Sequence, residues 1–218
     1  MGALTAGLLA ATPATAGEPV REVQAAQDAA VIVALGDSLT AGFGLPAEDS
    51  FTTRLEAALR AAGVDARVIN AGVSGDTSAG GRSRLDWVLA DAPDLVIVEL
   101  GGNDALRGLD PAMTYANLDD ILARMRARGI DVLLAGMLAP PNLGRDYGDA
   151  FNAIFPRLAA KHGVALYPFF LDGVAAARDL NQRDGIHPNA EGVEVIVEAI
   201  TPHVLRALVR SGAGAPGG

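Results

Sequence analysis

The sequence contains no cysteine, and this absence excludes three kinds of chemistry. Without a thiol the chain forms no disulfide, offers no thiolate nucleophile and supplies no cysteine ligand to zinc. Positive charge is also scarce, because 17 Lys and Arg stand against 26 Asp and Glu, for a formal net charge of -9. An electric field of that sign repels phosphate. We therefore expect neither a nucleic acid nor an anionic membrane as a partner.

Long apolar runs are missing as well, although 50% of the residues are hydrophobic. No segment approaches the roughly 18 uncharged residues that a membrane-spanning helix needs, so we expect no stable insertion into a bilayer. The N-terminus carries a short apolar run at residues 3–11, followed by Thr-Pro-Ala-Thr-Ala at 12–16, a pattern typical of a signal-peptidase site. Although no Lys or Arg precedes this run, we predict cleavage after Ala16 and a periplasmic or secreted protein. Residues 1–28 are then a signal-peptide remnant and a linker.

Short β-branched runs alternate with longer amphipathic segments between residues 29 and 210. This alternation is typical of β-α-β units and a parallel sheet, and the length fits one domain. The apolar runs are nearly continuous, which indicates strands that are covered on both faces. We predict a three-layer α/β/α sandwich with a five-stranded parallel sheet and a disordered tail at residues 211–218. The strands are expected at 31–35, 66–70, 95–100, 131–136 and 164–167, and the helices at 50–62, 81–90, 111–128, 148–162 and 190–209.

Residues with catalytic chemistry follow the ends of the predicted strands. Ser38 follows the first strand, Gly75 follows the second and Asn103 follows the third. Asp184 and His187 come between the last strand and the last helix. Because the carboxyl ends of parallel strands meet at one edge of a sheet, we expect all five residues in one crevice.

These residue types suit acyl transfer. A serine hydroxyl becomes a nucleophile when a base takes its proton, and an imidazole does this near neutral pH. Asp184 lies three residues before His187, and on a turn this spacing lets the carboxylate reach Nδ1 and orient the ring. Candidate donors to an oxyanion are the backbone N–H groups of Ser38 and Gly75 and the side-chain amide of Asn103. The pattern thus predicts an acyl-enzyme on Ser38.

Four sequence blocks in this order resemble the SGNH hydrolases, also called GDSL esterases, in the branch of thioesterase I, lysophospholipase L1 and arylesterases. The blocks are Gly36-Asp37-Ser38-Leu39, Asn70-Ala71-Gly72-Val73-Ser74-Gly75-Asp76-Thr77, Gly101-Gly102-Asn103-Asp104 and Asp184-Gly185-Ile186-His187-Pro188. The resemblance implies a flavodoxin-like sheet, no cofactor and no metal. It also implies hydrolysis of short- to medium-chain acyl esters, with thioesters and lysophospholipids as further substrates. The loop at 105–110 is implied to shift over a bound acyl chain.

Two other functions stay open at the level of the sequence. One is a metal-dependent phosphoesterase, whose candidate ligands are Asp37, Asp76, Asp104, Asp184 and His187. The other is a non-catalytic binding module on the same scaffold, in which Ser38 would have no chemical role. For the first three aspartates we favour turns braced by hydrogen bonds to backbone N–H groups.

The remaining unusual residues receive structural interpretations. We predict that Trp87 is part of the core, that His162 and His203 are solvated or structural, and that Arg107 is solvated. Apolar residues on the crevice loops are candidates to line an acyl pocket: Phe43, Leu45, Leu109, Leu138, Pro140 and Leu143. We expect a monomer that acts on a small-molecule ester or thioester.

Overall fold

The computed structural model describes residues 1–2 and 29–211. The predicted cleavage site after Ala16 lies outside the described residues, as do residues 212–218 of the predicted tail. The last described residue, Ser211, ends helix α9 (Ala190–Ser211). Among the described residues, no helix is long and apolar enough to cross a membrane.

Five parallel strands form one sheet in the order β2-β1-β3-β4-β5. This is the strand order of the flavodoxin-like fold, so the predicted sheet is confirmed. In its register, Gly36 at the end of β1 lies opposite Gly72 of β2 and Glu99 of β3. The carboxyl ends of the three strands therefore stop at the same edge. The strands are β1 (Ala30–Gly36), β2 (Ala66–Gly72), β3 (Leu95–Glu99), β4 (Asp131–Ala135) and β5 (Ala165–Tyr167).

The two central strands, β1 and β3, are covered on both faces, as their apolar sequences predict. Residues 32–35 and 95–98 are fully buried. Each fully buried Val, Leu or Ile contributes about 1.5–3 kcal/mol relative to an exposed one, so this layer is the stable support of the fold. The edge strand β2 differs, because its Arg67 is exposed and its burial alternates.

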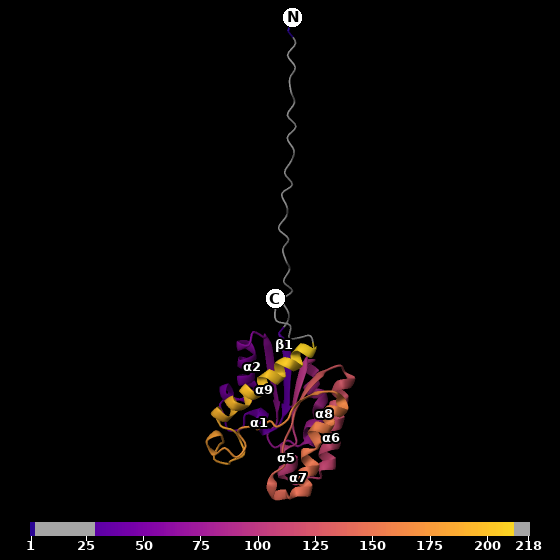
Figure 1. Ribbon diagram of the computed structural model, residues 1–218, viewed down its shortest axis with the longest axis vertical. Coiled ribbons are helices and arrows are strands. Elements are labelled where there is room, and N and C mark those ends of the chain that lie inside the picture. Colours follow the sequence, from indigo (N-terminus) through magenta and orange to yellow (C-terminus); the bar gives the residue numbers. More distant parts are fainter. Residues whose placement is uncertain (3–28, 212–218) are drawn as a thin grey trace.

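Helices cover both faces of the sheet, which confirms the three-layer sandwich. Figure 1 shows α2 (Phe51–Ala61) and α9 on one side, and α6 (Pro111–Ala127) and α8 (Ile154–His162) on the other. α2 packs against α9, while α6 packs against α8. Local chemistry sets the helix starts. The Ser50 side chain accepts a hydrogen bond from the backbone N–H of Thr53, and Asp110 caps α6 ahead of Pro111.

Two predicted helices are each broken in the structure. The segment predicted at 81–90 forms α3 (Ser78–Ser83), α4 (Leu85–Val88) and a short 3-10 turn, η2 (Leu89–Asp91). The segment predicted at 148–162 forms α7 (Arg145–Asn152) and α8. The prediction that Trp87 is part of the core is wrong, because this residue is 71% exposed. In the four-residue α4, Leu85 and Val88 are buried, and Trp87 lies on the outer side.

Short helices stand directly at the carboxyl ends of the central strands. α1 (Ser38–Ala41) follows β1, and α5 (Gly102–Leu106) follows β3. Each helix is joined to its strand by only one or two residues. In Figure 1 α5 lies beside α7 at the lower end of the molecule, and α1 lies above them, below the label of α9. The remaining 3-10 turns of the described chain are η1 (Ala47–Asp49), η3 (Pro141–Leu143) and η4 (Arg178–Leu180).

Candidate active site

Ser38, His187 and Asp184 form a continuous chain of hydrogen bonds. Oγ of Ser38, the first residue of α1, lies 2.8 Å from Nε2 of His187. Nδ1 of the same ring lies 2.7 Å from Oδ2 of Asp184. The structure therefore brings together the three residues that the sequence predicts as nucleophile, base and orienting carboxylate, in the geometry that activates a serine.

A tight turn holds the Asp184 carboxylate against His187. Its Oδ1 accepts hydrogen bonds from the backbone N–H groups of Ile186, at 2.9 Å, and of His187, at 3.1 Å. Gly185 adopts a φ of 72°, which favours glycine at the turn. The bond from Ile186, followed by the side-chain and backbone bonds of His187, lowers the pKa of Asp184 to about 2. The carboxylate is thus ionised at neutral pH, where it orients the imidazole.

Gln182 joins the histidine loop to the segment that follows the Ser38 helix. Its Nε2 donates to the carbonyl of Phe43, at 2.7 Å, and to that of Pro188, at 2.9 Å. The ring of Phe43 in turn lies 4.6 Å from the ring of His187, centroid to centroid. Gln182 was not among the predicted site residues, because its two partners lie in loops far apart in the chain.

The three predicted oxyanion donors lie at the ends of three neighbouring strands. The amide of Asn103, in α5, donates a 2.9 Å hydrogen bond to Oδ2 of Asp37, and an amide carries a second N–H for a ligand. Gly101, with a φ of 111°, makes the turn into that helix. Gly75 follows β2 with a φ of 81°, and its carbonyl accepts a 2.7 Å bond from Arg107. Arg107 is exposed, as predicted, but its side chain also has a protein partner, which was not predicted.

Two buried carboxyl groups lie beneath the Ser38 turn. Asp37 is 2% exposed and caps α1 by accepting from the backbone N–H of Leu39. Glu99, at the end of β3, is fully buried, and its Oε2 accepts from Thr40 Oγ1 at 2.8 Å and from the Asp37 N–H at 3.3 Å. Burial raises the pKa of Asp37 to about 6 and that of Glu99 well above its ordinary value. Glu99 was not among the predicted site residues.

Comparison with known proteins decides the family. Residues 34–195 match the model of the GDSL-like lipase/acylhydrolase family. The chain belongs to that family. The esterase TesA of Pseudomonas aeruginosa is 43% identical over 80% of this chain and 87% of its own. The thioesterase 1/protease 1/lysophospholipase L1 of Escherichia coli K12 is 40% identical over 77% of this chain and 79% of its own.

Solved structures agree with this assignment. The crystal structure of AlinE4, an esterase of the SGNH-hydrolase family, is 52% identical, with a TM-score of 0.71. The match covers 83% of this chain and 97% of that protein. The resemblance read from the four sequence blocks is thereby confirmed at the level of the family and the fold.

The aspartates of the GDSL-family blocks do not converge on a metal site. Asp104 accepts hydrogen bonds from the backbone and the hydroxyl of Ser78 and from Thr114, which braces α5 as predicted. Asp76 pairs instead with the guanidinium of Arg84, so backbone bracing is wrong for this residue. Among the described residues, no three His, Asp or Glu side chains gather as a metal site. The phosphoesterase interpretation therefore loses its ligand set.

The other predicted residues separate into those near the site and those far from it. Nε2 of His162 lies 2.7 Å from Asp119, and His203 packs on Tyr167, so both histidines are structural.

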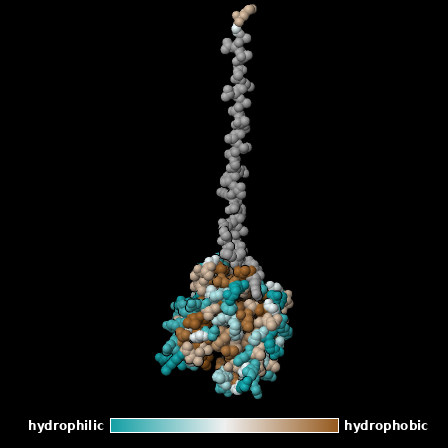
Figure 2. Space-filling model, viewed as in Figure 1, coloured by the Kyte–Doolittle hydropathy of each residue, from teal (hydrophilic) through white to brown (hydrophobic). Residues whose placement is uncertain are grey.

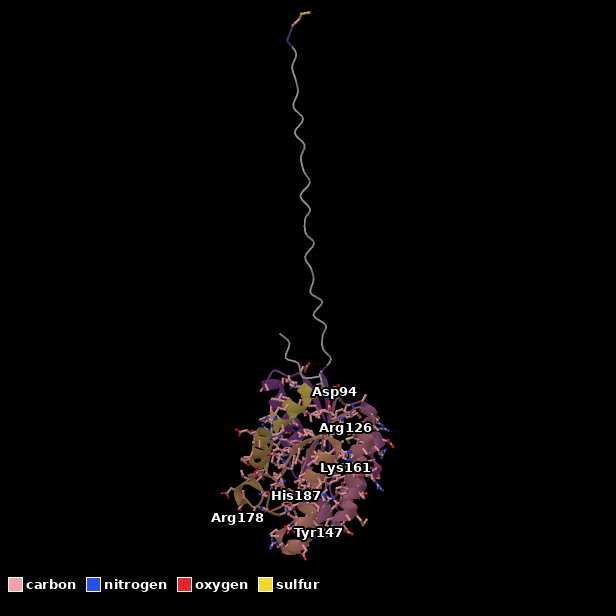
Figure 3. The ribbon with its side chains drawn as sticks, turned by 45° about the vertical axis from the view of Figure 1, so that its right-hand side comes forward. Asp94, Arg126, Tyr147, Lys161, Arg178 and His187 are labelled. Carbon is pink, nitrogen blue, oxygen red and sulfur yellow. The ribbon has the colours of Figure 1, made fainter. Side chains whose placement is uncertain are left out.

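Figure 3 shows His187 and Tyr147 at the lower end of the molecule, and Asp94 at the opposite end. Phe43, Leu109 and Leu138 are exposed. Figure 2 shows hydrophobic surface down the middle of this face, between hydrophilic margins.

Proposed function

We propose that this GDSL-family chain is a serine ester hydrolase that cleaves short- to medium-chain acyl esters through an acyl-enzyme on Ser38. The observation that carries the proposal is the unbroken chain of contacts from Ser38 through His187 to Asp184, at 2.8 Å and 2.7 Å. The esterase names of the P. aeruginosa relative and of AlinE4 support it.

In the first half of the reaction, Oγ of Ser38 bonds to the carbonyl carbon of the ester while its proton passes to Nε2 of His187. The carbonyl electron pair moves onto oxygen, and this oxyanion accepts hydrogen bonds from the backbone N–H groups of Ser38 and Gly75 and from the Asn103 amide. Asp184 stabilises the imidazolium that forms. The tetrahedral intermediate then expels the alcohol, which takes the proton from Nε2.

In the second half, water replaces the alcohol. His187 takes a proton from the water as its oxygen bonds to the acyl carbon, and the same three donors hold the new oxyanion. Collapse of this intermediate breaks the bond to Ser38, whose Oγ recovers the proton. The products are the carboxylic acid and the free enzyme, and no cofactor takes part in either half.

We propose that the acyl chain lies on exposed apolar side chains of the loops that follow the strands, among them Phe43, Leu109 and Leu138. Thioesters and lysophospholipids are proposed as further substrates, which the name of the E. coli relative supports. We also propose that the protein acts in the periplasm or outside the cell, because residues 3–16 have the pattern of a signal sequence. N-terminal sequencing of the mature protein tests this location.

Labelling with a fluorophosphonate tests the mechanism. The reagent is expected to add once per chain, at Ser38, and Ser38→Ala is expected to abolish both the adduct and ester hydrolysis. Ser83→Ala is the matched control, because that serine is exposed at the end of α3 and its hydroxyl donates to the carbonyl of Gly80. An adduct on another residue, or hydrolysis that resists the reagent and stops on addition of a chelator, would contradict the proposal.

A further inference from the structure

Arg84 fills the break between α3 and α4 with a side chain that is only 17% exposed. All three of its guanidinium nitrogens donate hydrogen bonds. Nε contacts Oδ2 of Asp76 at 2.7 Å, Nη1 contacts the carbonyl of Ala71 at 2.7 Å, and Nη2 contacts the carbonyl of Gly36 at 2.9 Å. A single side chain therefore joins two backbone carbonyls and one side-chain carboxylate.

The three acceptors belong to the two segments that carry the nucleophile and the proposed oxyanion donor. Gly36 ends β1 and is followed by Asp37 and Ser38. Ala71 lies in β2, and Asp76 directly follows Gly75. The guanidinium thus fixes the loop of Gly75 relative to the turn of Ser38, at the edge where β1 and β2 end side by side.

The arrangement requires arginine rather than any cation. A guanidinium is planar and presents its donors in a rigid fork, whereas an ammonium is a single charged point on a flexible stem. Lysine therefore cannot reach the two carbonyls and the carboxylate with the same geometry. The backbone makes room for this contact, because a Cβ on Gly80 would collide with the Asp76 carboxylate.

We propose that Arg84 is a positioning residue, which sets the Gly75 N–H at the distance from Ser38 Oγ that the tetrahedral oxyanion requires. This inference rests on the proposed function. In this role Arg84 acts through the Asp76 carboxylate and the carbonyls of Ala71 and Gly36, not by contact with the substrate. Its loss is expected to weaken stabilisation of the transition state and to leave binding of the ground-state ester nearly unchanged.

The test compares Arg84→Lys and Arg84→Gly with Arg82→Lys, a control in which an exposed arginine of α3 changes in the same way. Arg84→Lys is expected to lower kcat by about 10-fold to 10²-fold, the size of effect that a misplacement near 1 Å produces, with little change in KM. Millimolar ethylguanidinium is expected to restore part of kcat to Arg84→Gly, whereas ethylammonium does not. Arg82→Lys is expected to retain the original kcat.

A purely structural role for Arg84 predicts other results. A lower melting temperature with an unchanged kcat in the folded Arg84→Lys protein would overturn the inference. If both Arg84 variants fail to fold, Asp76→Asn takes their place: a fall in kcat without a rise in KM supports the inference, and full activity overturns it. Failure of the proposed function is distinct, because it appears as missing fluorophosphonate labelling of Ser38 in the unaltered protein.

Discussion

The side-chain amide of Asn103 donates a 2.9 Å hydrogen bond to Oδ2 of Asp37, the same residue whose Oδ1 caps the helix that begins at Ser38. One buried carboxyl group therefore holds both the nucleophile turn and a proposed oxyanion donor. Groups that are fixed before the substrate arrives need no reorganisation during the reaction, which is the condition for electrostatic stabilisation of a transition state.

Replacement of Asn103 by alanine is expected to lower kcat by about 10²-fold to 10³-fold, because one of three donors to the oxyanion is lost. KM is expected to change little. Steady-state kinetics on a soluble acyl ester measure both constants, and thermal unfolding shows whether the variant is folded. Turnover equal to that of the unaltered protein would exclude the role.

Asp37 is expected to make the protein less stable as the pH rises. Its pKa is raised from 3.8 to about 6 in the folded state, chiefly by burial, so the folded state keeps this proton after the unfolded state has released it. The contribution of Asp37 to the free energy of unfolding therefore falls between about pH 4 and pH 6, by about 3 kcal/mol at most.

Urea denaturation of the unaltered protein and of Asp37→Asn at several pH values isolates this contribution as the difference between two curves. Asp37→Asn is expected to gain in stability relative to the unaltered protein across that pH range. It is also expected to lose activity, because its amide does not replace both bonds of the carboxylate to Asn103 and Leu39. If the free energies of unfolding of the two proteins change in parallel with pH, the pKa of Asp37 is not raised by folding.

Asp184→Asn is expected to lower kcat by about 10²-fold to 10⁴-fold, because an amide no longer fixes the tautomer and charge of His187. Asp179→Asn is a suitable control, since that aspartate is exposed in the nearby turn η4. The pKa of Asp184 near 2 keeps this carboxylate ionised down to about pH 3. Titration of Asp184 by NMR, with a midpoint near 4 or above, would show that the turn does not hold it as described.

Trp87 offers a measurement that needs no substrate. Because Trp87 is 71% exposed, the single tryptophan is expected to emit at the wavelength of an indole in water and to be quenched readily by acrylamide. Trp87→Phe is expected to change the free energy of unfolding by no more than about 0.5 kcal/mol, as surface substitutions generally do. Blue-shifted emission from the folded protein would place the ring in the core instead.

The sequence predicts the sheet and the residues of the proposed triad because both have local signatures. Buried parallel strands are short continuous apolar runs, and Ser38 and His187 stand in blocks that follow such runs. Arg84, Glu99 and Gln182 have no such signature. Their contacts join residues 48, 59 and 139 positions apart, and no pattern within one segment specifies contacts of that range. Trp87 was misplaced because the helix predicted around it breaks at Arg84.

The contact between Ser38 and His187 spans 149 residues, from the first strand to the segment before the last helix. Contacts of such long range form late, because closure of the intervening chain costs entropy before the contact is made. Reactivity of Ser38 therefore indicates that the chain has folded completely. During refolding from urea, reactivity toward a phosphonate should return only after helical circular dichroism, once β5 and α9 have docked and His187 has reached the serine.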